Sequence, residues 1–168
     1  MKRNFQILRN LIRNLTWKAV KMFLTQPLFT LPTIWATIES ISLTEKHFED
    51  DSGGNGPANA FRHAAWNMLI AYYCTKITSE NNALQWAKKV TDLHEEIFIN
   101  QDFDREMDLH NNRIGRELFE TYKKQKIHSK IEMIHLLKEK SFTAYGTQDE
   151  NEFENHCDEM VYFKEDTE

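Results

Sequence analysis

Apolar residues recur every three or four positions along most of the chain, and this spacing predicts helices throughout. No stretch alternates apolar and polar residues with a period of two, so we expect no strands. Pro27 and Pro32 are expected to separate the first helix from the second, and the glycine-rich stretch at residues 50–57, DDSGGNGP, is expected to form a loop. The expected helices cover residues 5–22, 33–48, 58–77, 81–98, 105–122 and 129–145.

The first of these helices is basic and amphipathic. Residues 1–35 contain six Lys and Arg residues and no acidic residue, and the apolar positions lie opposite most of the charges. Such a helix either docks on the rest of the fold or lies in a membrane interface, where Lys and Arg attract anionic lipids. An organellar transit peptide fits less well, because this segment has a single Thr and no Ser before residue 25. No apolar run reaches the roughly 20 residues that span a bilayer.

The helix expected at 58–77 is apolar on nearly every side, which is typical of a central helix surrounded by others. It nevertheless carries Asn59, Arg62 and His63, and Asn59 and His63 lie one turn apart on the same face. Buried polar and charged groups are costly unless they are paired. We therefore expect these three residues to have partners inside the protein.

Two further helices direct polar groups toward the core. In the helix at 81–98, His94 falls on the apolar stripe and Glu95 on its flank. In the helix that begins at 105, Asn111 falls inside the apolar stripe, whereas Asp108 and Asn112 border it. Since buried polar groups must satisfy one another, the inward residues of all three helices are expected to meet in one network.

A metal centre is the first interpretation of that network. Imidazole nitrogens and carboxylate oxygens suit Zn, Mn or Fe, and helical bundles build such sites from facing side chains. The expected ligands are His63, His94, Glu95 and Asp108, with Asn111 or Asn112 as a further ligand or a supporting partner. His110 lies farther round its helix and is expected to face away from the core.

A second interpretation needs no metal. His63 or His94 would be a general base oriented by Asp108, while Arg62 and the first amides of the helix after Pro57 receive an anionic group, which suits a phosphoester. The expected catalytic residues are thus His63, His94, Asp108 and Arg62, and substrate binding is expected of Asn59, Arg62, Asn111 and Asn112. A third interpretation is structural: the polar residues satisfy one another and fix helix packing.

Composition and charge exclude several classes of function. The net charge is −5, and because residues 1–35 are +6 the remainder is −11, which argues against a nucleic-acid partner and disfavours a nuclease-type toxin. Cys74 and Cys157 are far apart and form no CxxC, so a disulfide framework and a zinc ribbon are not indicated, and a reducing cytoplasmic compartment is expected. The glycine loop lacks the ending of a Walker motif, which disfavours nucleoside triphosphates.

The chain length of 168 residues is typical of one domain with a sizeable core, an all-α helical bundle. Within it we expect amphipathic N-terminal helices over residues 1–48, a helical core that carries the polar site over residues 49–146, and an acidic tail over residues 147–168. That tail is expected to be a solvated, partly ordered terminus.

Three stretches, NAFRHAAWNMLIA, WAKKVTDLHE and MDLHNNRIGRELF, together resemble a bacterial domain family of unknown function marked by N-A-x-R-H-x-x-W, H-E and M-D-L-x-N-N-x-x-G-R motifs. QPLFTLPTIWAT and MVYF are similar to short stand-alone members from Bacteroidetes-type bacteria, and other relatives look like terminal modules of large, toxin-like surface proteins. The resemblance implies an enzymatic activity without identifying it, and it adds Arg116 to the expected substrate-binding residues. It places at motif positions Asn59, Arg62, His63, Trp66, His94, Glu95, Asp108, Asn111, Asn112, Gly115 and Arg116.

The leading hypothesis from the sequence is a small bacterial hydrolase, dependent on a divalent metal ion such as Zn or Mn, that acts on a phosphate-bearing or membrane-derived substrate, a small molecule or a lipid. Its expected location is the cytoplasm at the inner face of the membrane, with peripheral contact through the basic N-terminal helix. The alternative is a non-catalytic, membrane-associated binding or regulatory protein with a structural polar network.

Overall fold

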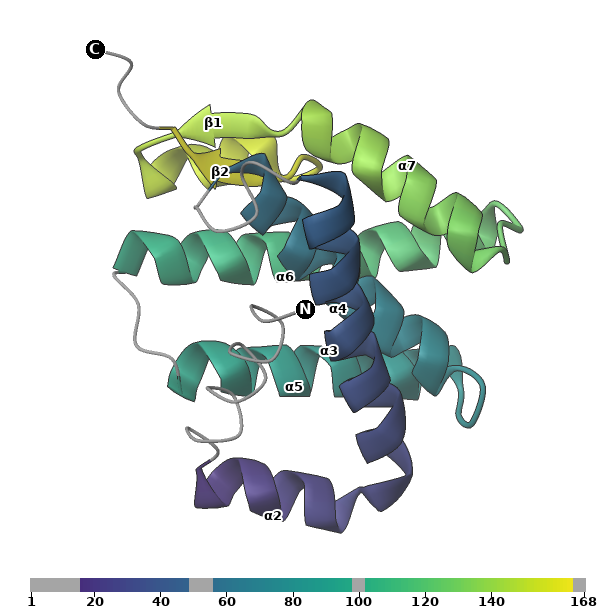
Figure 1. Cartoon of the computed structure of the whole chain (residues 1–168). Helices are drawn as coiled ribbons and strands as arrows, with labels where there is room; N and C mark the ends of the chain where they lie inside the picture. Colours follow the sequence, from purple (N-terminus) through teal and green to yellow (C-terminus); the bar gives the residue numbers. More distant parts are fainter. Residues whose placement is uncertain (1–15, 49–55, 98–101, 165–168) are drawn as a thin grey trace.

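The computed structural model describes residues 16–48, 56–97 and 102–164, which fold as a helical bundle (Figure 1). The fold class predicted from the sequence, all-α, is confirmed, while the helix expected at 5–22 lies mostly outside the described residues. The elements are α2 (Trp17–Thr25), α3 (Pro27–His47), α4 (Pro57–Cys74), α5 (Glu80–Ile97), α6 (Asp102–Lys124), α7 (Lys130–Phe142), β1 (Tyr145–Thr147), the 3-10 helix η1 (Glu150–His156) and β2 (Val161–Phe163).

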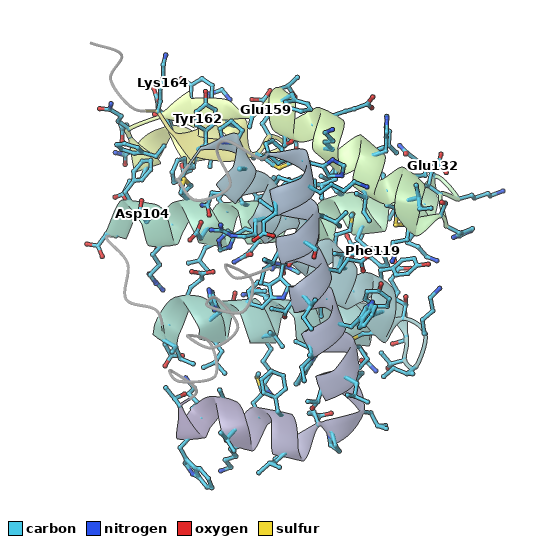
Figure 2. All side chains as sticks on the ribbon, viewed as in Figure 1. Asp104, Phe119, Glu132, Glu159, Tyr162 and Lys164 are labelled. Carbon is cyan, nitrogen blue, oxygen red and sulfur yellow. The ribbon has the colours of Figure 1, made fainter. Side chains whose placement is uncertain are left out.

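Helix α4 is the central element, because α3, α5, α6 and α7 all pack against it. Phe61, Leu69 and Ile70 are fully buried although they lie on different sides of α4, as its apolar pattern predicted. Burying each such side chain stabilises the fold by about 1.5–3 kcal/mol. The outer helices have one buried and one exposed face, as Figure 2 shows: Phe119 of α6 points into the bundle, whereas Glu132 of α7 points outward.

A glycine allows α6 to approach α4 closely. A Cβ added at Gly115 would lie 2.2 Å from the carbonyl oxygen of Ala64 and 2.7 Å from its Cα. These atoms belong to the backbone of the central helix, so they cannot rotate away as a flexible side chain would. Gly115 therefore fixes the separation at which residues of α4 and α6 face one another.

We expect Gly115→Ala to destabilise the protein by about 3 kcal/mol, near the upper end for overpacking a core. The reason is that the added methyl group must push two buried helices apart. Thermal unfolding followed by circular dichroism measures this, with the exposed Thr121→Ala on the same helix as the control. An unchanged melting temperature for Gly115→Ala would mean that the α4–α6 contact is looser than the structure shows.

Pro32 does not separate two helices, which corrects the expectation from the sequence. Helix α3 begins at Pro27, at the first helical position that suits proline, and continues through Pro32 to His47. Pro32 removes only the hydrogen bond to the carbonyl of Leu28, and because Leu28 is 76% exposed, water reaches that first turn. No described helix has the length and the apolar composition to cross a membrane.

The segment after α7 is ordered through residue 164 and contains two short strands that the sequence pattern did not predict. Strands β1 and β2 pair in parallel, with Tyr145 opposite Val161 and Thr147 opposite Phe163. A small apolar cluster formed by Met107, Phe153 and Val161 fastens this segment to α6. The many acidic residues predicted exposure correctly for their own side chains, but a few apolar residues between them are enough to anchor the segment. The predicted boundaries at residues 48 and 146 stay predictions.

Candidate metal centre

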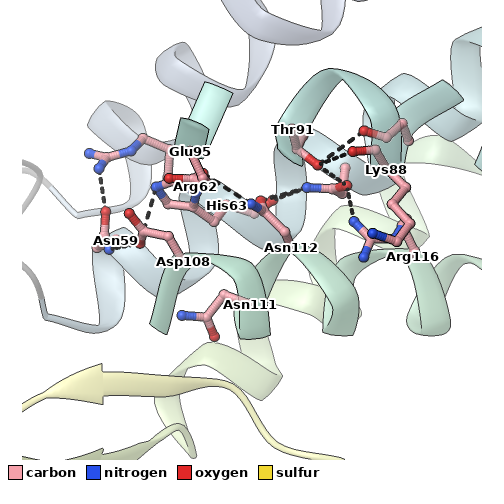
Figure 3. A network of polar contacts seen from close by, with 12 residues as sticks. Asn59, Arg62, His63, Lys88, Thr91, Glu95, Asp108, Asn111, Asn112 and Arg116 are labelled. Atoms are coloured by element: carbon pink, nitrogen blue, oxygen red, sulfur yellow. Dashed lines mark hydrogen bonds and ion pairs between the residues drawn. The ribbon is translucent and has the colours of Figure 1, made fainter. Parts of the chain in front are cut away.

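Three ionisable side chains converge from three helices, His63 from α4, Glu95 from α5 and Asp108 from α6 (Figure 3). One potential metal-ligating atom from each lies within 4.8 Å of the others. His63 Nε2 is 3.3 Å from Asp108 Oδ1, and His63 Nδ1 is 3.5 Å from Glu95 Oε1. All three residues are buried, with exposed fractions of 5%, 2% and 5%. The structure thus brings together three of the four ligands expected from the sequence.

Amide side chains orient the two carboxylates. Asn59 Nδ2 donates a hydrogen bond of 2.7 Å to Asp108 Oδ1, and the Asn59 carbonyl oxygen accepts one from Arg62 Nη2. Asn112 Nδ2 donates a hydrogen bond of 3.1 Å to Glu95 Oε1. The geometry therefore assigns Asn59 and Asn112, expected to bind substrate, to holding the carboxylates in place.

The network continues away from the centre through two residues that the sequence analysis missed, Asn67 and Thr91. Asn67 Nδ2 donates to Asn112 Oδ1 at 2.6 Å. Its carbonyl oxygen accepts from Thr91 Oγ1 at 3.2 Å and from Arg116 Nη1 at 2.7 Å. Arg116 lies at one end of the row and Arg62 at the other (Figure 3). Asn67 lies one turn after His63 in an apolar helix, which is the signal that could have identified it.

His94 stands beside the cluster of His63, Glu95 and Asp108, and the expectation that it is a fourth ligand stays a prediction. Its ring centroid is 6.5 Å from that of His63 and 5.1 Å from that of Trp66, and the His94 and Trp66 rings pack in a T-shaped arrangement. Neighbouring residues on a helix point about 100° apart. Of these two neighbours, Glu95 is the one whose carboxylate lies in the cluster with His63 and Asp108.

Both polar atoms of the Asn111 side chain pair with the backbone of β2, and its expected part in substrate binding stays a prediction. Its Nδ2 donates to the Val161 carbonyl oxygen at 2.8 Å, and its Oδ1 accepts from the Val161 amide at 3.0 Å. Both ends of this buried amide are thus used in pairing with β2. His110, expected to face outward, is also buried, and its Nε2 lies 2.8 Å from the carbonyl oxygen of Glu159.

We expect Asn111→Ala to loosen the C-terminal segment while leaving the candidate centre intact. Two backbone groups of Val161 lose their partner, and each buried unpaired group costs about 1–3 kcal/mol. Hydrogen–deuterium exchange should therefore rise across residues 145–164 and stay unchanged in α4. Asn151→Ala, at an exposed position of η1, is the control. Equal protection in both variants would contradict the anchoring role of Asn111.

Burial sets the charge state of the cluster. Desolvation, together with the charge of Arg62, lowers the pKa of His63 to about 3. Desolvation, together with the Asp108 carboxylate, raises the pKa of Glu95 to about 8, and desolvation raises that of Asp108 to about 6. Desolvation also lowers the pKa of His94 to about 3. Both imidazoles are thus neutral at neutral pH, and Glu95 holds a proton in the absence of another cation.

Two buried atoms of the cluster lack a hydrogen-bond partner within the described part of the chain, His63 Nδ1 and Glu95 Oε2. Leaving a buried polar atom unpaired costs about 1–3 kcal/mol, so native proteins rarely do so without a reason. Both atoms belong to side chains that commonly ligate metals. A cation between His63, Glu95 and Asp108 would supply the missing partner, so the residues present fit a metal ion.

Comparison with known proteins gives one match at the level of a family. The model of a domain of unknown function, DUF6973, matches residues 20–145, a range that contains α3 to α7 and the whole His63–Glu95–Asp108 cluster. No curated protein and no solved structure gives a significant match to the chain.

Proposed function

Since the chain belongs to this family of domains of unknown function, its activity has to be inferred from its site, and we propose that it is a metal-dependent hydrolase of a phosphate-bearing substrate. The observation that carries the proposal is the buried cluster of His63, Glu95 and Asp108, with its two unpaired ligand atoms. A structural polar network would be expected to satisfy these atoms internally.

The donor set suits a catalytic rather than a closed structural metal site. One imidazole nitrogen and two carboxylate oxygens favour ions such as Zn²⁺ or Mn²⁺. Three protein ligands leave room for a water molecule or a substrate oxygen, whereas structural zinc sites use four protein ligands. When bound, such an ion lowers the pKa of a coordinated water and offsets negative charge on a phosphoryl oxygen.

Arg62 supports the assignment of a phosphate-bearing substrate. It is only partly buried, and its charge reaches the centre. The guanidinium counteracts the rise that burial causes in the pKa of Asp108, and it adds to the fall in the pKa of His63. Guanidinium groups bind phosphate through paired, charge-assisted hydrogen bonds. Arg62 also lies in the second turn of α4, near the positive end of the helix dipole. Substrate would thus be held at the Arg62 side of the cluster.

His94 is suited to accept a proton from the attacking water. The support is its position, since it lies beside His63 without belonging to the ligand cluster. Burial lowers its pKa to about 3, which leaves the imidazole neutral and able to accept a proton at neutral pH but makes it a weaker base than one whose pKa lies near the working pH. A general base of this kind typically contributes a factor of about 10²–10⁴ in rate. We assign His63, Glu95 and Asp108 to metal binding, His94 to proton transfer and Arg62 to substrate binding.

The test uses full-length protein without a histidine tag, stripped with a chelator and reloaded with Zn²⁺, Mn²⁺ or Mg²⁺. We expect one bound ion per chain by elemental analysis and a melting temperature higher by about 5–10 °C at a hundredfold excess over Kd. The reloaded protein should hydrolyse the phosphodiester probe bis(p-nitrophenyl) phosphate. Asp108→Asn, which preserves side-chain volume, should lose both responses, whereas Asp92→Asn on the outer face of α5 should keep them.

The outcomes separate the parts of the proposal. Absence of bound ion with all three metals rejects the metal centre. A bound ion without hydrolysis of phosphodiester or phosphomonoester probes rejects the hydrolase and leaves a structural ion. Hydrolysis that persists in Asp108→Asn rejects the assignment of this cluster as the active site.

A further inference from the structure

Helix α3 exposes five large apolar side chains. The exposed positions follow one helical stripe, and their exposed fractions range from 41% to 76%. The opposite, buried face of α3 carries mainly small or hydroxyl-bearing residues, including Thr33, Ala36, Ser40 and Thr44. The exposed stripe consists of Leu28, Leu31, Ile34, Trp35 and Ile38.

Specific contacts fix α3 in this orientation. Trp86 Nε1 donates to Thr33 Oγ1 at 2.9 Å, and Trp66 Nε1 donates to Thr37 Oγ1 at 2.8 Å. Small inward residues also let α3 pack closely along α4. Turning the leucines inward would break both indole hydrogen bonds and force bulky side chains into that contact. The outward stripe is therefore a consequence of the fold.

Helix α2 extends the exposed apolar surface. Trp17 and Leu24 are 77% and 70% exposed, whereas Ala19 and Met22 face the protein. Gln26 alone joins α2 to α3, so Leu24 and Leu28 lie on either side of one tight junction (Figure 1). Large apolar side chains that are exposed together on neighbouring helices mark a candidate interaction site.

Charge identifies the partner. The first 38 residues contain six Lys and Arg and no Asp or Glu, and Lys18 and Lys21 are exposed on α2 itself. Two copies that met through this surface would bring two basic segments together, whereas an anionic lipid surface attracts them. Tryptophan, present here as Trp17 and Trp35, favours the boundary between lipid and water.

We propose that the outward stripe of α3, with Trp17 and Leu24 of α2, docks on an anionic bilayer and lies in its interface. The basic N-terminal contact expected from the sequence falls largely on residues 1–15, outside the described residues, so the proposal rests on α2 and α3. It is independent of the proposed hydrolase activity.

Vesicle flotation of the full chain tests the proposal. Phosphatidylcholine vesicles are compared with vesicles that also contain phosphatidylglycerol. Leu28→Ser combined with Leu31→Ser removes the two most exposed leucines of the stripe, each 76% exposed, and should not change the melting temperature. Ile131→Ser on α7 is the matched control, because Ile131 is equally exposed, at 78%, but lies on another helix.

We expect the wild-type chain to float with the anionic vesicles and its tryptophan emission to shift to shorter wavelength. The double variant should bind at least about tenfold more weakly, and the control should bind like the wild type. Absence of wild-type binding, or equal binding by the double variant, would overturn the proposal. So would a solution dimer that the double variant dissociates in the absence of lipid binding, since the stripe would then be covered by a second copy.

Discussion

Glu95→Gln is expected to stabilise the metal-free protein at alkaline pH and to abolish its response to metal. Glu95 is 2% exposed, and burial and Asp108 raise its pKa from the ordinary 4.5 to about 8. The folded state therefore holds a proton that the unfolded state has released between pH 4.5 and 8. Stability falls as the pH rises through that window, and above pH 8 the loss is complete, on the order of 3–5 kcal/mol at about 1.4 kcal/mol per pKa unit.

The glutamine side chain matches the neutral form of Glu95 in shape and in hydrogen bonding. Its carbonyl oxygen can replace Glu95 Oε1, which accepts from Asn112 and lies 3.5 Å from His63 Nδ1. The charge that makes Glu95 costly in the metal-free protein is the charge that a metal requires. The substitution thus trades function for stability, as active-site substitutions commonly do.

Chemical denaturation in the presence of a chelator, at pH 5 and at pH 9, measures the effect. At pH 5 Glu95→Gln should leave the free energy of unfolding nearly unchanged, and at pH 9 it should raise it. The metal-induced rise in melting temperature should disappear. The neighbouring Glu96→Gln, whose side chain is 60% exposed beside Lys18, is the control and should show neither change. A Glu95→Gln variant less stable than wild type at pH 9 would mean that the carboxylate is ionised and well paired in the folded protein.

Periodicity predicted what depends on local geometry. The central position of α4 followed from its apolar residues on every side, and the inward direction of His63, Asp108 and Asn111 followed from their angles around the helix. The convergence of polar residues from three helices also followed, because buried polar groups need partners. The fold class and the existence of an inward polar cluster were therefore accessible from the sequence.

Partners distant in the chain were not accessible. Asn111 points inward as expected, yet its partner is the backbone of Val161, fifty residues later, and no periodic signal marks that pairing. The sequence also could not decide which of His94 and Glu95 faces the contact between α4 and α6, since both lie near the apolar stripe of α5. The orientation of α3 depends on Trp66 and Trp86, whose indole N–H groups donate hydrogen bonds to hydroxyl groups on its inner face. In each case long-range contacts choose between orientations that local rules leave open.

Replacing His63 and His94 one at a time is expected to separate metal binding from proton transfer. His63→Ala removes a member of the ligand cluster, so it should lose the metal-induced rise in melting temperature and the hydrolysis of the phosphodiester probe. His94→Ala should keep the metal response but lower turnover by about 10²–10⁴-fold. The exposed His135→Ala is the control and should change neither.

Both substitutions should change the response to acid in the same direction. Burial lowers the pKa of His63 and of His94 to about 3, below the ordinary 6.5, so the unfolded state binds more protons between these values. Wild-type stability must therefore fall as the pH drops from 6.5 toward 3, and each variant should fall less steeply. The two histidines share one environment but differ in position relative to Glu95 and Asp108. If His94→Ala also loses the metal response, His94 is a fourth ligand and the proton must leave by another residue.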